Sequence, residues 1–136
     1  MACLIDAKKI RFRRRGNGGN LIATYHDPCH LGRHSGIYDA PRAVIRATGA
    51  RFVELPRNRE NAWCCGVGGG VKTGFPEMAG ATGRSLVEEA LSVGARTIVT
   101  ACPACESGLA DVVKGAGELR GVRIMDVVDL VADCVE

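Results

Sequence analysis

The chain has 136 residues, an apolar fraction of 46% and a charged fraction of 24%, values typical of one soluble globular domain. It contains no apolar run long enough to cross a membrane, and no segment has the layout of a secretory signal, which excludes the membrane-spanning and secreted classes. We therefore expect a cytoplasmic protein that meets a membrane only through partner subunits, where its seven cysteines indicate metal or redox chemistry before disulfides.

The positive charge is concentrated at the start of the chain. Residues 1–20 carry six basic side chains and one acidic one, a net charge of +5, whereas residues 21–136 carry 12 basic and 14 acidic side chains. This first segment also contains the turn-prone run 16–20, and Phe12 is its only aromatic residue. The sequence thus predicts a basic flexible leader or linker over 1–20 and a domain over 21–136, and we expect no nucleic-acid partner.

Strands and helices are predicted to alternate along the domain. In chain order we expect a strand over 21–25, a helix over 39–48, a strand over 51–55, a helix over 78–93, a strand over 97–100, a helix over 106–114, a strand over 122–125 and a helix over 127–134. Such alternation with short apolar strands is typical of an α/β fold. We predict an open, mainly parallel sheet of about four strands with flanking helices.

Five cysteines fall into three groups, and each group follows a predicted strand. These are Cys29, the adjacent pair Cys64 and Cys65, and the Cys-x-x-Cys formed by Cys102 and Cys105. Ligand sites in open parallel sheets form at the carboxyl ends of the strands, so the three groups should converge on one edge. Cys3 and Cys134 are expected to be bystanders, because free cysteines commonly serve as small apolar residues.

Ligand number favours an iron–sulfur centre at this edge. Five thiols exceed the four that a tetrahedral zinc site uses, and adjacent cysteines suit different irons of a cluster better than one small ion. The glycine-dense run 66–70 would let the backbone approach closely. Zinc held by four of the thiols remains the alternative, as an occupant or as the centre of a structural docking domain. A thioredoxin-type dithiol of Cys102 and Cys105 would leave the other three cysteines unexplained.

Three histidines surround the first cysteine. His26, His30 and His34 are spaced by four residues, which could place them on one helix face as ligands. Because five thiols already suffice, we expect them to lie around the metal centre without binding it. His26 and His30 are the candidate proton donors, and no other catalytic side chain is predicted.

The motifs resemble those of the cysteine-rich CCG domain family. They are Tyr-His-Asp-Pro-Cys-His-Leu-Gly over 25–32, Trp-Cys-Cys-Gly over 63–66 and Cys-Pro-Ala-Cys over 102–105. This family occurs in the D- and B-type catalytic subunits of heterodisulfide reductases and in iron–sulfur subunits of glycolate, lactate and glycerol-3-phosphate oxidation. The match extends from about Leu21 to the end of the chain.

The resemblance implies a non-cubane 4Fe-4S cluster, held by all five cysteines as cofactor and metal ligands. It implies electron transfer and the reduction of a small disulfide. It also implies as partners a second domain of this kind and a ferredoxin-like iron–sulfur module or subunit. We therefore expect this domain to be part of an oxidoreductase and to need those modules for activity.

Overall fold

The strands of the computed structural model form one sheet in which every pair is parallel. The structure describes residues 1–12 and 21–135. The strand order is β2-β1-β3-β4. The strands are β1 (Ile22–Tyr25), β2 (Arg51–Phe52), β3 (Thr97–Thr100) and β4 (Arg123–Asp126). The predicted fold class is confirmed.

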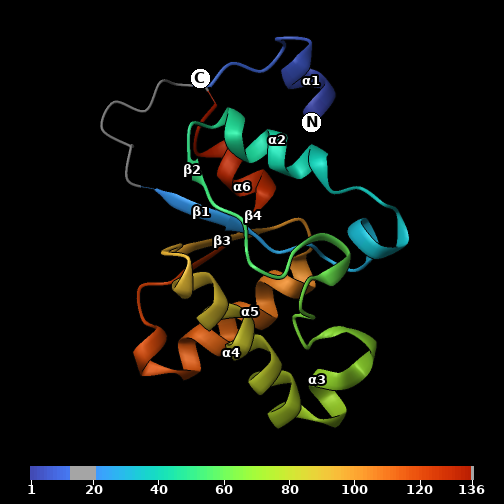
Figure 1. Ribbon diagram of the computed structural model, residues 1–136, viewed down its shortest axis with the longest axis vertical. Coiled ribbons are helices and arrows are strands. Elements are labelled where there is room, and N and C mark those ends of the chain that lie inside the picture. Colours follow the sequence, from blue (N-terminus) through green and yellow to red (C-terminus); the bar gives the residue numbers. More distant parts are fainter. Residues whose placement is uncertain (13–20, 136) are drawn as a thin grey trace.

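Helices cover both faces of this sheet (Figure 1). One face carries α2 (Asp39–Ala47) and α6 (Val127–Ala132), and the other carries α4 (Pro76–Ser92) and α5 (Pro103–Gly115). The remaining helical segments are α1 (Ala2–Asp6), the π-helix η1 (His30–His34), the 3₁₀ turns η2 (Arg59–Asn61), η3 (Gly68–Gly70) and η4 (Gly117–Leu119), and α3 (Val71–Gly74).

Each face of the sheet has its own apolar core. Leu86 of α4 and Leu109 of α5 pack against Ile98 on one face, and Ile45 of α2 and Leu130 of α6 pack on the other. All five side chains are fully buried. Because helices cover both faces of the sheet (Figure 1), the loops at the strand ends are left as the places where a site can form.

Register brings the ends of the two central strands to the same level. Tyr25 of β1 pairs with Val99 of β3, and the His26 N–H donates to the Val99 carbonyl at 2.9 Å. On β3, Val99 also pairs with Met125 of β4. The segments that follow β1 and β3 therefore leave the sheet side by side.

Several element boundaries differ from those predicted. The helices α4 and α5 begin at Pro76 and Pro103, two and three residues earlier than their apolar periodicity indicates. Proline suits the first helical turn because it has no N–H to leave unpaired there. β2 covers only two residues, and the predicted loop after β1 contains η1.

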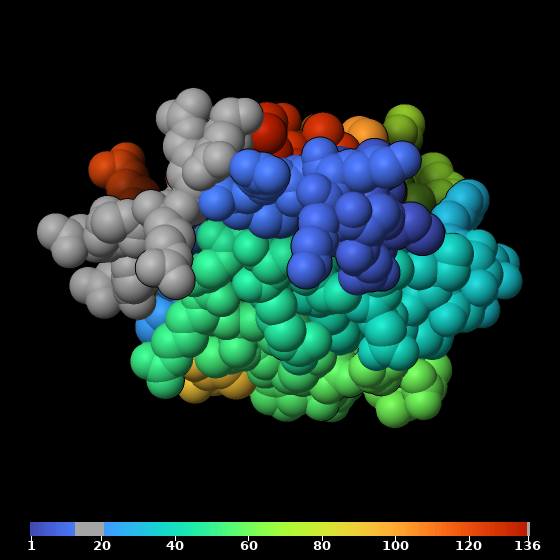
Figure 2. All heavy atoms as spheres, turned by 90° about the horizontal axis from the view of Figure 1, so that it is seen from above, coloured from blue at the N-terminus to red at the C-terminus, as the bar shows by residue number. Residues whose placement is uncertain are grey.

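Part of the predicted leader is helical. α1 lies against α2, and Figure 2 shows the first residues spread over the α2 surface. Phe12 forms an isolated antiparallel bridge with Val135. Residues 13–20, which contain the whole predicted turn-prone run, lie outside the described residues, so the assignment of residues 1–20 as a leader stays a prediction.

Candidate metal centre

All five predicted cysteines line one cavity at the carboxyl edge of the sheet. The cavity has a volume of about 710 Å³, and its lining includes Cys29, Cys64, Cys65, Cys102 and Cys105. All five thiols are free. The structure thus brings together residues that lie 76 positions apart in the sequence, between Cys29 and Cys105.

The first cysteine follows β1 in a loop fixed by a buried ion pair. Asp27 is buried, and its two carboxylate oxygens accept hydrogen bonds from Arg42 of α2 at 2.7 and 2.8 Å. One of these oxygens also accepts the backbone N–H of Arg59 at 2.7 Å. Asp27 therefore joins the loop that carries Cys29 to the loop that leads to Cys64.

The pair of cysteines lies in the long segment after β2. Cys65 is buried and Cys64 is exposed, so the two sulfurs occupy different depths. Gly66 follows with φ +83, and a Cβ there would lie 2.6 Å from the carbonyl oxygen of Ala79. Only glycine fits this turn, because a side chain would meet both a positive φ and the backbone of α4.

The third group begins α5. Cys102 is the N-cap residue, Pro103 occupies the first turn, and Cys105 lies one turn into the helix and is buried. The N-terminal end of a helix favours thiolate because its first N–H groups point toward the sulfur. Close packing locks this helix to the second loop, since a Cβ on Gly108 would lie 1.9 Å from Val67.

The two buried cysteines and a buried histidine meet at the base of the cavity. The ligand atoms of His26, Cys65 and Cys105 all lie within 4.8 Å of one another. The Cys105 thiol is the main cause that lowers the pKa of Cys65 to about 4, with smaller contributions from His26 and the Val67 N–H against the effect of burial. The same contact raises the pKa of Cys105. The contact therefore favours a thiolate at Cys65 and a protonated thiol at Cys105.

The predicted histidine cluster is divided between two places. His26 is buried, and neither of its ring nitrogens has a hydrogen-bond partner among the described residues. His30 and His34 lie in η1 and line the cavity, with their ring centroids 5.3 Å apart. The three rings do not share one helix face, because His26 directly follows β1 and lies outside η1, which contains His30 and His34. Cys3 and Cys134 are absent from the cavity lining.

Two arginines near the first loop were not singled out from the sequence. Arg42 is 1% exposed and donates hydrogen bonds to the carboxylates of Asp27 and Glu54 and to the Tyr38 carbonyl. Arg33 of η1 donates to the Cys29 sulfur. Arg42 lies three residues before Ile45, so its place on the apolar face of the helix predicted over 39–48 was a signal in the sequence. The contact of Arg33 with Cys29 depends on the π-helix η1 and has no such signal.

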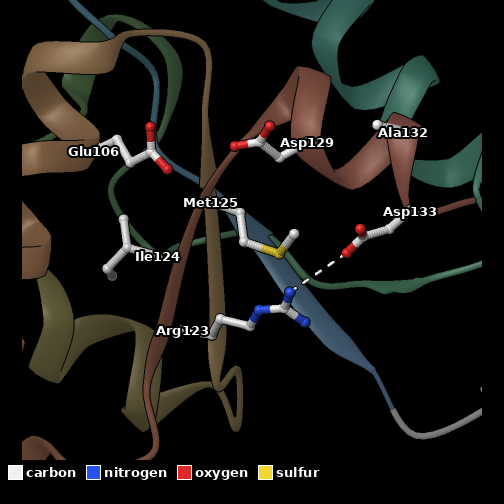
Figure 3. A pocket seen from close by; sticks show the side chains of 7 residues that line it. All are labelled: Glu106, Arg123, Ile124, Met125, Asp129, Ala132 and Asp133. Atoms are coloured by element: carbon white, nitrogen blue, oxygen red, sulfur yellow. Dashed lines mark hydrogen bonds and ion pairs between the residues drawn. The ribbon is translucent and has the colours of Figure 1, made fainter.

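A second cavity lies beside β4 and differs in chemistry. It has a volume of about 330 Å³ and contains no thiol in its lining. Figure 3 shows Glu106, Asp129 and Asp133 around it, with Arg123 paired to Asp133 at 3.4 Å. The Glu106 carboxylate accepts the backbone N–H of Asp126 at 3.2 Å. This acidic cavity is separate from the cysteine site.

No helix among the described residues is long and apolar enough to cross a membrane.

Comparisons with known proteins agree with these motifs. A family model described as CCG, cysteine-rich domain, matches residues 23–110. The D-type subunit of the dihydromethanophenazine:CoB–CoM heterodisulfide reductase from Methanosarcina barkeri is 43% identical over 99% of this chain and 32% of its own length. The probable iron-sulfur-binding oxidoreductase FadF of Bacillus subtilis is 38% identical over 82% of this chain and 16% of its own length.

A third relative is the B-type subunit of the fumarate reductase (CoM/CoB) of Methanothermobacter marburgensis, with 35% identity over 82% of this chain and 23% of its own length. The chain spans about a third of the length of the heterodisulfide reductase relatives. These relatives are named as iron–sulfur proteins or as subunits of larger oxidoreductases.

Proposed function

This chain belongs to the cysteine-rich CCG domain family, and from that premise we propose that it is the iron–sulfur redox domain of a heterodisulfide reductase-like complex or of a related complex of 2-hydroxy acid oxidation. The observation that carries the proposal is the convergence of five free cysteines on one cavity of about 710 Å³. A redox role for such a site agrees with the names of the relatives.

The proposed ligands are Cys29, Cys64, Cys65, Cys102 and Cys105, holding a non-cubane 4Fe-4S cluster. The donor set fits such a group because five thiolates exceed the needs of one tetrahedral ion. The different depths of Cys64 and Cys65 suit a body larger than a single atom. Neither ring nitrogen of buried His26 has a hydrogen-bond partner among the described residues, which supports a bound group that forms hydrogen bonds at the base of the cavity.

The proposed reaction converts a small disulfide into two thiols. A disulfide takes up two electrons and two protons in this step, and the bound cluster would supply the electrons one at a time. The chain itself contributes the cavity and the proton donors. His30 is exposed and lines the cavity, so it is suited to protonate a leaving thiolate. Buried His26 is suited to donate a proton to the sulfurs of Cys65 and Cys105.

The proposed partners are a second domain of this family and a ferredoxin-like iron–sulfur module or subunit. Such partners would bring electrons to the cysteine site and take part in substrate binding. The supporting observation is that the heterodisulfide reductase relatives are about three times as long as this chain. A membrane would be approached only through those partners, in a cytoplasmic complex.

Zinc is the second candidate occupant, and one observation favours it. The buried trio of His26, Cys65 and Cys105 has the closeness of a mononuclear site. A zinc-bound domain would serve as a structural or docking module without electron transfer. Zinc predicts that His26→Ala loses the metal, whereas the cluster predicts that this variant keeps its iron.

Anaerobic reconstitution tests the proposal. Iron, acid-labile sulfide and zinc should be counted per chain, and the reduced and oxidised forms studied by electron paramagnetic resonance. We expect several irons with matching sulfide in the native chain and in Cys3→Ser, the matched control, and loss of the native spectrum in Cys64→Ser and in Cys65→Ser. One zinc per chain, or unchanged iron and spectra in both serine variants of the pair, would refute the five-cysteine assignment.

A further inference from the structure

Arg33 joins two walls of the cysteine cavity. Its Nη1 donates a hydrogen bond to the Cys29 sulfur at 3.2 Å. Its Nε donates to the carbonyl of Glu60 at 3.2 Å, and its Nη2 donates to the carbonyl of Ala62. Ala62 stands two residues before Cys64 in the chain. One side chain therefore fixes the separation between Cys29 and the loop that carries the cysteine pair.

The geometry requires an arginine at this position. All three nitrogens of the guanidinium are used, each toward a different acceptor. A lysine has a single ammonium nitrogen, which cannot match a planar fork aimed at separated acceptors. The η1 segment provides the placement, because the His34 N–H donates to the Cys29 carbonyl at 3.1 Å in a π-helical turn. Such turns are found frequently at functional sites.

The contact also places a permanent positive charge against a proposed ligand sulfur. Hydrogen bonds to ligand sulfurs and nearby charge set the reduction potential of an iron–sulfur centre. A cluster becomes more negative when it accepts an electron, so a fixed cation stabilises the reduced state more than the oxidised state. The charge of Arg33 should therefore raise the potential.

We propose that Arg33 is a positioning residue that holds Cys29 in register with the Cys64–Cys65 loop and raises the reduction potential of the centre. This inference rests on the proposed iron–sulfur function. It assigns to Arg33 no direct contact with substrate. Its action is exerted through the Cys29 sulfur and through the two carbonyls of the second loop.

The first test is a redox titration of the reconstituted chain followed by electron paramagnetic resonance. In Arg33→Gln, which keeps hydrogen-bond donors but removes the charge, we expect a more negative midpoint. A tenfold change in the ratio of reduced to oxidised centre would correspond to about 59 mV for a one-electron couple. Arg33→Lys should shift the midpoint less. Arg84→Gln is the control, because Arg84 pairs with Glu118 and Glu88 and does not line the cavity.

The second test uses the metal-free chain. At about pH 10, where free thiols are ionised, alkylation of Cys29 should be faster in Arg33→Met than in the native chain, because the thiolate loses the hydrogen bond that holds it. Mass spectrometry of the peptides measures the rate, and alkylation of Cys3 should be unchanged. Loss of iron from both Arg33→Gln and Arg33→Lys would also support the positioning role, because neither side chain can reach all three acceptors, provided that the metal-free variants unfold at the native urea concentration.

The two proposals fail in different ways. A native chain that takes up no iron would refute the proposed function. If the native chain takes up iron, two results would overturn the role of Arg33. One is a native midpoint in Arg33→Gln together with native alkylation of Cys29. The other is loss of the fold in every Arg33 variant, which would make the residue a general support of the structure.

Discussion

Replacement of Arg42 by methionine should strongly destabilise the metal-free domain. The guanidinium makes five hydrogen bonds, with lengths of 2.6 to 3.0 Å, to the carboxylates of Asp27 and Glu54 and to the Tyr38 carbonyl. It also stacks over the Tyr25 ring at 5.2 Å. Burial alone would lower the pKa of Arg42, but the bonds to Asp27 and Glu54 outweigh burial and raise it.

The magnitude follows from the burial of the pair. The side chains of Arg42 and Asp27 are 1% and 2% exposed, so Arg42→Met leaves a buried carboxylate without its counter-ion. Breaking a buried pair by removing one partner costs about 3–5 kcal/mol. Glu54 adds less, because its side chain is 36% exposed and water screens it. With a urea dependence of about 2 kcal/mol per molar, the unfolding midpoint should fall by about 2 M.

Urea unfolding of reduced, metal-free protein, followed by far-ultraviolet circular dichroism, measures this change. Lys72→Met is the matched control, because it breaks a surface ion pair with Asp111. The side chain of Lys72 is 42% exposed and that of Asp111 is 51% exposed. We expect the control to lose at most about 1 kcal/mol. Adding Asp27→Asn to Arg42→Met should restore part of the loss, since it removes the unpaired charge. Equal midpoints for Arg42→Met and Lys72→Met would refute the reasoning, as would a double variant that shows simple additivity.

Two further predictions concern the packing and the charge at the base of the cavity. Gly108→Ala should destabilise the domain by about 1–3 kcal/mol in urea unfolding, because the new Cβ would overlap Val67, whereas Gly80→Ala in α4 meets open space and should stabilise it by up to about 1 kcal/mol. Equal effects of the two substitutions would contradict the packing argument. Since the pKa of Cys65 is lowered to about 4 in the fold and an unfolded thiol titrates near 8.5, the folded state of the metal-free chain gains stability as pH rises through this range and loses it toward pH 4. Urea midpoints at pH 5 and pH 8 should differ more in the native chain than in Cys65→Ser, and an equal difference would argue against a thiolate at Cys65.

Much of the fold is predictable from sequence because local pattern and global packing agree. Short apolar runs such as 97–100 become buried strands, and each cysteine group follows a strand, so the parallel sheet alone brings the groups to one edge. Helix starts are less predictable, since apolar periodicity begins only where a helix meets the core. α4 and α5 therefore begin earlier than that periodicity, at Pro76 and Pro103.

The missed features depend on geometry that no local sequence pattern records. The place of Arg42 in its helix indicates burial, but its partner Asp27, 15 positions earlier, is apparent only in the structure. The turn at η1 carries no apolar period, and its π-helical bond from His34 to Cys29 is visible only in three dimensions. His26, His30 and His34 follow one another at intervals of four residues, yet His26 lies directly after β1 and outside η1, which contains the other two.

Contacts within the protein join the three cysteine loops to one another. Asp27 and Arg33 join the first loop to the second, and the packing of Val67 against Gly108 joins the second to the third. Small metal-dependent domains instead fold only when the ion binds, and part of the free energy of metal binding is then needed to order the chain. Here the sheet, the buried Arg42 network and the two cores order the segments that carry the cysteines. If the proposed cluster binds here, cysteines already held in place by the protein would leave more of the binding free energy to the cofactor, and their sulfurs would move less between oxidation states. Such rigidity suits an electron carrier better than a zinc module whose only task is to hold the chain together.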